Sequence, residues 1–255
     1  MSRRSVEREV IDERAMNGAL LDGKVALISG STRGIGRSMA ETFARAGARV
    51  VVNGRREEDA LAVAASIPDS IGVGGDMADP SAIERLVGKV VDECGRVDIL
   101  VNNAAISRRS ALTRVTDEEW NEVIRVNLTG PMYLTRAVVP VMKRQGGGVL
   151  LNVISGAGTH GTIGFSSYAA SKGGLVGLTM TWAQELAGFG IRVNALSPAA
   201  LTDMMRELPP ELLGPIEESL PSPDDVADVA LFLVSDLAKL VNGQIVGAGS
   251  GGARR

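Results

Sequence analysis

The chain has 255 residues, 45% of them hydrophobic, and a formal net charge of −3, so it can bury a large core and has the usual length of one α/β domain. This charge balance gives no general attraction for nucleic acid or an anionic membrane surface, and we expect neither as a partner. One cysteine (Cys94) and one histidine (His160) exclude an internal disulfide and a zinc site of such ligands. This cysteine use is typical of the reducing cytoplasm, so we expect a cytoplasmic protein without a metal.

Residues 1–20 carry charges of both signs and lack an apolar segment. A signal peptide or a membrane anchor needs such a segment. We therefore expect residues 1–20 to be an extension ahead of one folded domain, residues 21–255.

From residue 24 onward, short apolar runs alternate with longer stretches typical of helices. The runs lie at 24–29, 49–53, 71–75, 97–102, 148–155, 191–196 and 244–249. Most are apolar almost throughout, as strands of a parallel sheet covered on both faces are. Helices are expected near 35–46, 57–66, 80–94, 117–143, 166–189 and 224–235. This order predicts an α/β fold in a single domain: a Rossmann-like, doubly wound sheet of seven parallel strands.

The proline-rich segment 197–223 interrupts this alternation and carries several methionine and leucine residues. Methionine adapts its shape to irregular apolar ligands. We expect a lid or substrate loop at 197–223, although the same pattern also suits the buried face of a short helix.

The first strand leads directly into a glycine-rich turn, "GSTRGIG" at 30–36. Glycines at these positions permit a tight turn and a close backbone approach, and the helix that starts near Ile35 would direct its free amides at a pyrophosphate. An ordinary glycine-rich turn between a strand and a helix is the alternative, and the turn alone does not decide between them.

The end of the second strand bears on which dinucleotide would bind. A site that selects NAD normally presents a carboxylate to the adenosine ribose there, whereas this chain has Asn53, Gly54 and Arg55. Arg33 in the turn and Arg55 have the charge and the forked geometry to hold a 2′-phosphate. We expect NADPH to be preferred over NADH. The opposing feature is Asn53, whose amide could serve an unphosphorylated ribose.

Tyr168 and Lys172, in "YAASK", are four residues apart on a predicted helix and can face one site. Lowering a tyrosine pKa from about 10 by ~2–3 units needs ~3–4 kcal/mol. A unit charge at ~4 Å in an effective dielectric of ~20 supplies about 4 kcal/mol, so Lys172, assisted by an oxidised nicotinamide, is adequate for that task. A packed tyrosine beside a solvated lysine is the alternative, which spacing alone does not exclude.

Five features together resemble the short-chain dehydrogenase/reductase family. They are "GSTRGIG" at 30–36, "NNAA" at 102–105, "VNLTG" at 126–130, Ser155 thirteen residues before Tyr168, and "YAASK" at 168–172. They stand in the family's order, and the resemblance covers about residues 22–249. It implies a dinucleotide-binding catalytic domain whose reaction interconverts a ketone and a secondary alcohol. The stretch 98–128 is similar to 3-oxoacyl-(acyl-carrier-protein) reductases, which implies a 3-oxoacyl thioester on carrier protein or coenzyme A as substrate.

The resemblance implies a catalytic tetrad of Asn127, Ser155, Tyr168 and Lys172. Tyr168 would give its proton to the carbonyl oxygen, which Ser155 would also hold by a hydrogen bond. Lys172 would bind the nicotinamide ribose and lower the pKa of Tyr168. Asn127 would hold a water that links the lysine to solvent.

The cofactor contacts expected from the turn and the resemblance lie in six segments of the chain. They are Gly30, Ser31, Thr32, Arg33, Gly34, Ile35, Gly36, Arg55, Asp76, Met77, Asn103, Ala104, Tyr168, Lys172, Pro198, Leu201 and Thr202.

The chain departs from the family pattern at several positions. The family usually has Thr where Ser29 stands, Gly where Ala105 stands, and Pro-Gly where Pro198 and Ala199 stand. Thr202 is also one residue nearer to the proline than usual, which bears on the backbone path beside the nicotinamide. His160, five residues after Ser155, is either a substrate contact or an exposed loop residue.

Two other functions remain open. One is a reductase or dehydrogenase of a sugar, steroid or secondary-metabolite ketone. The other is a non-catalytic dinucleotide-sensing protein, which would be expected to lose the tyrosine or the lysine. The resemblance and the two long helices at 117–143 and 166–189, which have more apolar and small residues than one sheet face can cover, predict a homotetramer.

Overall fold

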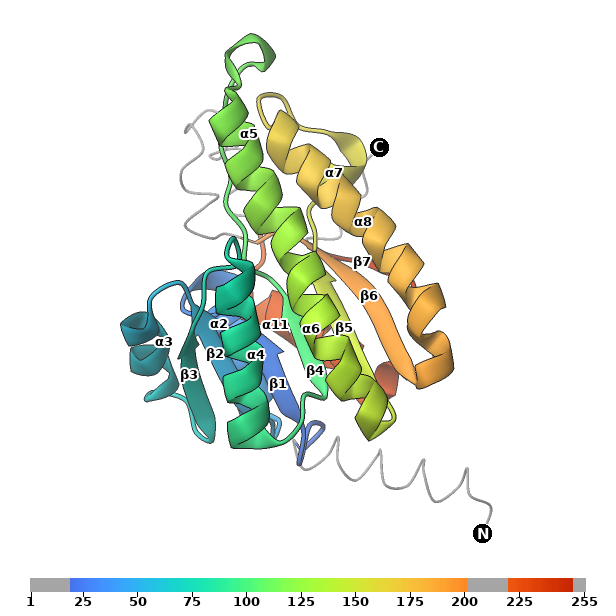
Figure 1. Ribbon diagram of the computed structural model, residues 1–255. Helices are drawn as coiled ribbons and strands as arrows, with labels where there is room; N and C mark the ends of the chain where they lie inside the picture. The colour runs from blue at the N-terminus through green and yellow to red at the C-terminus, as the bar shows by residue number, and fades with distance from the viewer. Residues whose placement is uncertain (1–18, 201–219, 250–255) are drawn as a thin grey trace.

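The computed structural model describes residues 19–200 and 220–249, where the seven apolar runs form strands. The strands are β1 (Val25–Ile28), β2 (Arg49–Gly54), β3 (Ser70–Gly74), β4 (Ile99–Asn102), β5 (Gly148–Val153), β6 (Ile191–Pro198) and β7 (Ile245–Ala248). Each lies within two residues of its predicted bounds. All neighbouring strands are parallel, in the order β3-β2-β1-β4-β5-β6-β7. The predicted doubly wound seven-stranded sheet is confirmed (Figure 1).

The helices cover both faces of this sheet. They are α2 (Gly34–Arg45), α3 (Glu57–Ala64), α4 (Pro80–Cys94), α5 (Asp117–Ile124), α6 (Gly130–Gln145), α7 (Ala157–His160), α8 (Ser166–Leu186) and α11 (Pro223–Val234). Local capping fixes several ends: the Asp79 carboxylate accepts from the Ser81 amide ahead of α4, and Ser222 and Asp225 form a capping box at α11. The α4 helix stops at Gly95, which is left-handed with φ 72°.

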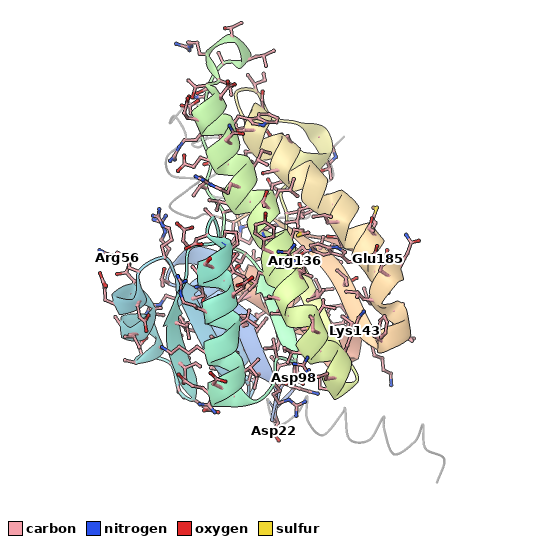
Figure 2. The ribbon with its side chains drawn as sticks, viewed as in Figure 1. Asp22, Arg56, Asp98, Arg136, Lys143 and Glu185 are labelled. Atoms are coloured by element: carbon pink, nitrogen blue, oxygen red, sulfur yellow. The ribbon has the colours of Figure 1, made fainter. Side chains whose placement is uncertain are left out.

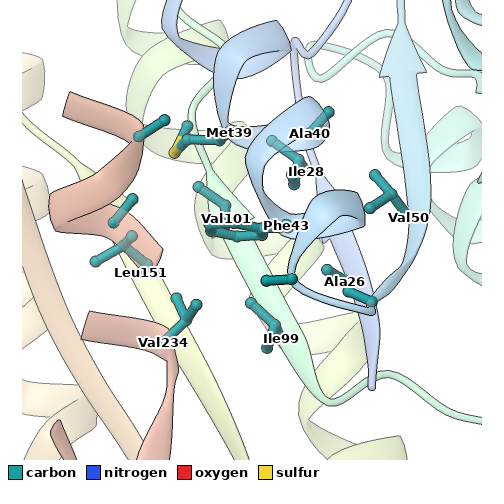
Figure 3. Packing of buried hydrophobic residues seen from close by; sticks show 14 of the residues in the cluster. Ala26, Ile28, Met39, Ala40, Phe43, Val50, Ile99, Val101, Leu151 and Val234 are labelled. Carbon is teal, nitrogen blue, oxygen red and sulfur yellow. The ribbon is translucent and has the colours of Figure 1, made fainter. Parts of the chain in front are cut away.

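A large core forms on each face of the sheet because successive strand residues point to opposite faces. On one face, residues of α2 and α11 surround Phe43, which packs beside Ala26, Ile28, Ile99 and Val101 of the sheet (Figure 3). On the other face, α4, α6 and α8 cover alternate residues of the same strands. The outward sides of α6 and α8 carry exposed charges, among them Arg136, Lys143 and Glu185 (Figure 2).

The predicted single helix over 117–143 is interrupted. A π-helical turn, η2 (Arg125–Thr129), separates α5 from α6, although the three form one long rod in Figure 1. A π turn inserts one extra residue and changes which side chains face the sheet. The sequence did not reveal it because both flanks have the apolar spacing of a normal helix.

Three predicted features fall wholly or partly outside the described residues. These are most of the extension at 1–20, the middle of the substrate loop at 197–223, and the cofactor contacts Leu201 and Thr202. None of the helices in the described ranges is long and apolar enough to cross a membrane. In the same ranges, no three His, Cys, Asp or Glu side chains gather where they could hold a metal ion.

Candidate active site

The predicted phosphate turn lies against the loop that follows β4. Gly30 has φ +64°, and a Cβ atom there would lie 2.8 Å from the Cα atom of Ala104. A Cβ atom on Gly36 would lie 2.5 Å from the Asn103 side-chain nitrogen. Asn103 in turn donates to the backbone carbonyls of Ser29 at 3.0 Å and Gly30 at 2.9 Å. These glycines therefore permit a backbone-to-backbone contact that any side chain would prevent.

Ser29, which stands where the family usually has threonine, uses its hydroxyl to join two strands. Its hydroxyl accepts hydrogen bonds from the amides of Asn103 at 3.0 Å and Ala104 at 3.1 Å. It also donates to the Val101 carbonyl at 3.2 Å. The hydroxyl alone is enough to join the ends of β1 and β4, so this departure from the pattern leaves the site intact.

The turn leads into α2 with free amides at the helix start. Gly34 is left-handed, with φ +56°, and Ile35 in the first turn packs against the core. Within the described part of the chain, Arg33 at the N-cap makes no side-chain capping bond. An uncapped N-terminus beside a glycine cradle is the arrangement that binds phosphate groups, so these residues fit a dinucleotide.

Asn53 is a structural residue and does not face the ribose position. It is buried, and its side-chain nitrogen donates to the carbonyls of Val73 and Gly75, each at 3.2 Å. Its side-chain oxygen accepts from the Gly30 amide at 3.3 Å. The hydroxyl of Ser31 accepts from the Asn53 amide at 3.0 Å, which ties the glycine turn to β2. The interpretation that Asn53 serves an unphosphorylated ribose is therefore wrong for this arrangement.

Gly54 and the arginines near it have a different environment. A Cβ atom on Gly54 would lie 2.7 Å from Cγ2 of Thr32, so Thr32 fills the space where an acidic side chain would begin. Arg33 and Arg55 are exposed, and neither side chain has a hydrogen-bond or ion-pair partner in residues 19–200 and 220–249. Arg56, by contrast, pairs with Asp59 at 2.6 Å. Two guanidinium groups without a partner among the described residues therefore lie close in sequence to the glycine turn and to the end of β2.

The predicted adenine-flanking pair has structural contacts. The Asp76 carboxylate accepts from the Ala78 amide at 2.8 Å, as a loop-capping aspartate does. Met77 is buried, and its backbone packs closely on Gly130. A Cβ atom built on Gly130 would lie 2.5 Å from the Met77 carbonyl oxygen. Pro198, another predicted contact, ends β6 at the same edge of the sheet.

Ser155, Tyr168 and Lys172 come together where β5 ends and α8 begins. The Ser155 hydroxyl lies close enough to the phenol of Tyr168 to lower its pKa. The Lys172 ammonium group donates to the Val153 carbonyl at 2.7 Å and lies 5.8 Å from the centroid of the Tyr168 ring. The Phe165 ring packs edge-on against Tyr168, with centroids 6.2 Å apart. The constellation expected from the motifs thus forms one cluster.

The pKa values in this cluster differ from one expectation. Burial raises the pKa of Tyr168, and the hydrogen bond from Ser155 lowers it by less. Burial also lowers the pKa of Lys172 to about 8. The predicted lowering of the Tyr168 pKa by Lys172 is not what this arrangement produces. The shift of the Tyr168 pKa comes from burial and from Ser155, while the Lys172 ammonium group donates to the Val153 carbonyl.

Asn127 lies in the π turn and joins three parts of the site. Its side-chain oxygen accepts from the Ile106 amide at 2.9 Å, and its side-chain nitrogen donates to the Ile106 carbonyl at 2.8 Å. The same nitrogen donates to the Ser171 hydroxyl at 3.2 Å. Both amide hydrogens are used, so the side chain pins the loop after β4 to α8. The sequence indicated a water contact for Asn127 but did not indicate its bonds to Ile106 and Ser171.

The short helix α7 follows Ser155 and was not predicted. Its Gly158 packs on the backbone of α8, where a Cβ atom would lie 2.6 Å from the Lys172 carbonyl carbon and 2.7 Å from the Gly173 amide. The small residues around Gly158 and Gly173 were the available signal. His160 at the end of α7 is exposed and bonds the neighbouring Thr159 hydroxyl at 2.8 Å, so the loop interpretation fits it.

A hydroxyl pair and a buried lysine beside a glycine-rich turn, at the carboxyl edge of a parallel sheet, define a Rossmann-fold oxidoreductase that uses a nicotinamide dinucleotide. The chain belongs to the short-chain dehydrogenase family, whose model, described as short chain dehydrogenase, matches residues 24–212. The resemblance stated from the motifs is confirmed. The protein is an enzyme of this oxidoreductase family.

Curated relatives match nearly the whole chain. The 3-oxoacyl-(acyl-carrier-protein) reductase FabG of Thermotoga maritima is 40% identical over 244 residues, which is 91% of this chain and 98% of that protein. FabG of Escherichia coli K12 is 37% identical over 241 residues, or 90% and 97% of the two chains. Among solved structures, a 7α-hydroxysteroid dehydrogenase complexed with NADH and 7-oxo glycochenodeoxycholic acid superposes with a TM-score of 0.87. It is 33% identical and covers 94% of this chain and 98% of its own.

Proposed function

We propose that this protein reduces a ketone to a secondary alcohol with NADPH, and that its substrate is a 3-oxoacyl thioester. The observation that carries the proposal is the cluster of Ser155, Tyr168 and Lys172 beside a glycine turn with free helix amides. The substrate class is supported by the two FabG relatives at 40% and 37% identity. A cyclic ketone such as a steroid is the second candidate, favoured by the hydroxysteroid dehydrogenase neighbour.

In the proposed reaction, Ser155 and Tyr168 hold the carbonyl oxygen of the substrate. A bound nicotinamide supplies the hydride. Tyr168 gives its phenolic proton to the oxygen as negative charge develops there, because burial raises the pKa of Tyr168 and keeps the phenol protonated at neutral pH. Ser155 stays hydrogen-bonded to the same oxygen and orients it.

Lys172 stabilises the phenolate that remains after the proton has left. At the 5.8 Å between its nitrogen and the ring centroid, a unit charge contributes roughly 3 kcal/mol in an effective dielectric of about 20. This stabilisation arises mainly in the product of proton transfer, because in the resting protein the phenol is neutral. Asn127 is a positioning residue, since its side chain holds the loop after β4 against α8.

Tyr168→Phe tests the proposal, with Tyr133→Phe on α6 as the matched control. The panel should contain 3-oxoacyl thioesters and cyclic ketones, followed by NADPH absorbance. Loss of the general acid should lower turnover by ~100-fold or more while cofactor affinity is retained. Tyr133→Phe should leave turnover unchanged. Near-normal turnover in Tyr168→Phe would overturn the role of Tyr168.

The preference for NADPH is supported by Arg33 and Arg55, which lack protein partners among the described residues. A hydrogen bond to a charged group is worth ~1.5–3 kcal/mol, so each arginine should contribute roughly ten- to hundredfold to NADPH affinity. Titration of both cofactors should show that Arg55→Asp reverses or erases the preference. Arg56→Asp is the control, because Arg56 is already paired with Asp59. Equal wild-type affinities for NADH and NADPH would contradict the preference.

We also propose a homotetramer built through the long helices, in the cytoplasm, with residues 1–20 as an extension and 197–223 as the substrate loop. The outer faces of α6 and α8 support the tetramer, because Met132 and Met180 are 36% and 44% exposed there. Gly177 of α8 is exposed as well and permits close packing of a second helix. Light scattering that gives the monomer mass of 26.6 kDa at micromolar concentration would exclude the assembly.

A further inference from the structure

The loop after β4 is tied to two elements that also carry candidate-site residues. Asn127 holds its beginning through the two hydrogen bonds with Ile106. Four residues later, the Ser110 amide donates to the Gly164 carbonyl at 2.9 Å, and Gly164 lies four residues before Tyr168. The loop and the segment between α7 and α8 thus meet at the same end of the molecule (Figure 1). Residues 107–109 are therefore joined, through Ser110, to the segment that leads into α8 and Tyr168.

Arg109 is held on this loop by packing. Gly164 has φ +82°, and a Cβ atom built on it would lie 3.2 Å from Cγ and 3.6 Å from Nε of Arg109. The stem of the arginine therefore lies across the bare glycine while the residue as a whole stays exposed. Packing of this kind restricts the long side chain before any ligand arrives, which lowers the entropy cost of binding.

The carboxylates near Arg109 are engaged by its neighbours. Glu122 pairs with Arg108 at 3.1 Å, and Glu119 accepts from the Ser110 hydroxyl at 2.9 Å. Arg109 itself has no ion-pair or hydrogen-bond partner in the part of the chain that the structure describes. Among the described residues, the two adjacent arginines thus differ: Arg108 pairs with a carboxylate, whereas the Arg109 side chain has no protein partner.

Apolar side chains flank this cation. Ile163, next to Gly164, is 92% exposed, and Leu112, three residues after Arg109, is 78% exposed. A surface that joins a fixed guanidinium to exposed aliphatic groups fits a ligand with an alkyl part and an anionic part.

We propose that Arg109 binds an anionic group of the substrate, a carboxylate or a phosphate, at the entrance of the active site. This inference rests on the proposed ketoreductase function and narrows its substrate class. The planar guanidinium forms two parallel hydrogen bonds with either anion. A 3-oxoacyl thioester on a phosphorylated pantetheine arm and a keto acid both meet the requirement, whereas an uncharged ketone does not.

Pairs of substrates that differ only in the anion test the proposal. One pair is 3-oxobutanoyl-pantetheine with and without its 4′-phosphate, and the other is 4-oxopentanoate with its methyl ester. Arg109→Ala should raise KM for the charged member of one pair by about tenfold, the effect of one lost charged hydrogen bond at an exposed site. It should leave kcat, and both constants for the neutral member, within twofold. Arg108→Ala, which removes the paired arginine of the same loop, should change neither.

The two pairs separate the sources of the anion. A response confined to the phosphate pair supports the pantetheine arm, and one confined to the carboxylate pair supports a keto acid. Equal losses on charged and neutral members would mean that Arg109 only shapes the loop, and this outcome overturns the proposal. So does an unchanged KM for both charged substrates.

A binding measurement separates failure of this inference from failure of the proposed function. Calorimetry with pantetheine 4′-phosphate and with 4-oxopentanoate is done with the enzyme saturated with NADP⁺, which cannot reduce a ketone, so that the probes bind without reaction and do not occupy the cofactor arginines. Binding by wild type and Arg108→Ala, with about tenfold weaker binding by Arg109→Ala, supports the inference even if no ketone in the panel is reduced. Equal affinities in the three proteins overturn it even if ketones are reduced rapidly.

Discussion

Adding one methyl group at Gly158 should slow the reaction far more than it destabilises the fold. The new Cβ atom would lie 2.6 Å from the Lys172 carbonyl carbon and 2.7 Å from the Gly173 amide, whereas ordinary contacts begin near 3.4 Å. Both neighbours are backbone atoms in the middle of α8, which cannot rotate away. The short helix α7 must therefore move outward by about 0.8 Å, the difference between 2.6 Å and 3.4 Å.

This displacement reaches the proposed catalytic pair directly. Ser155 precedes α7 by two residues, and its hydroxyl accepts from the Ala157 amide at 3.2 Å. A misplacement near 1 Å typically costs about 100-fold in rate, so we expect kcat of Gly158→Ala to fall by roughly that factor. Overpacking costs typically 1–3 kcal/mol, which for a chain of this size lowers Tm by roughly 2–12 °C. The enzyme should therefore remain folded at 25 °C.

The assay is NADPH oxidation with the best ketone of the panel, measured beside a thermal melt. Gly156→Ala is the matched control, because Gly156 has helical angles of φ −54° and ψ −27° and a Cβ there meets no atom within 4 Å in the described ranges. That variant should keep full activity and gain a few tenths of a kcal/mol of stability. If Gly158→Ala turns over within threefold of wild type, the close packing of α7 on α8 does not position Ser155.

Three further outcomes follow from buried groups. Burial lowers the pKa of Lys172 from 10.5 to about 8, so the unfolded chain binds more protons than the folded chain between these pH values. The free energy of unfolding of wild type should therefore rise by up to about 3 kcal/mol between these pH values, and urea titrations of Lys172→Met should lack this rise. Gly54→Asp alone should lower the affinity for both NADH and NADPH, because the new Cβ atom would lie 2.7 Å from Cγ2 of Thr32. The double variant with Thr32→Ser should shift the ratio of affinities, measured by fluorescence titration, toward NADH by about tenfold or more. A full switch of preference by Gly54→Asp alone would refute the steric argument. The Arg192 guanidinium donates to three carbonyls at 3.0–3.1 Å. Arg192→Met should therefore lower the free energy of unfolding in urea by about 3 kcal/mol or more and leave kcat unchanged. A decrease under 1 kcal/mol would contradict the stabilising role of these bonds.

Much of the fold was predictable because the strongest signals in it are local. Each strand is a run of apolar residues long enough to be buried on both faces, and each run was located within two residues. The glycine turn and the four-residue spacing of Tyr168 and Lys172 are also local, so the sequence alone indicated which residues would gather at the site. The family resemblance added Ser155 and Asn127, whose positions depend on long-range contacts.

Other features were decided only by contacts between distant segments. Asn53 looked available to a ribose, but its side-chain nitrogen donates to the carbonyls of Val73 in β3 and of Gly75 just after that strand. Asn127 was expected to hold a water, and the fold shows in addition that its side chain bonds Ile106, twenty-one residues earlier in the chain. A sequence pattern records which groups are polar, while the folded chain determines which of them bind each other.

The sequence by itself therefore determined the order of the strands along the chain, the parallel α/β class and the side chains expected to gather at the candidate site, because propensity and spacing act over a few residues. Only the tertiary structure decided the π turn at Arg125–Thr129, the existence of α7, and the direction in which the pKa of Tyr168 moves. These depend on burial and on close approach between α7, α8 and the end of β5. Desolvation and packing are properties of atoms brought together from separate parts of the chain, and no local run of residues encodes them.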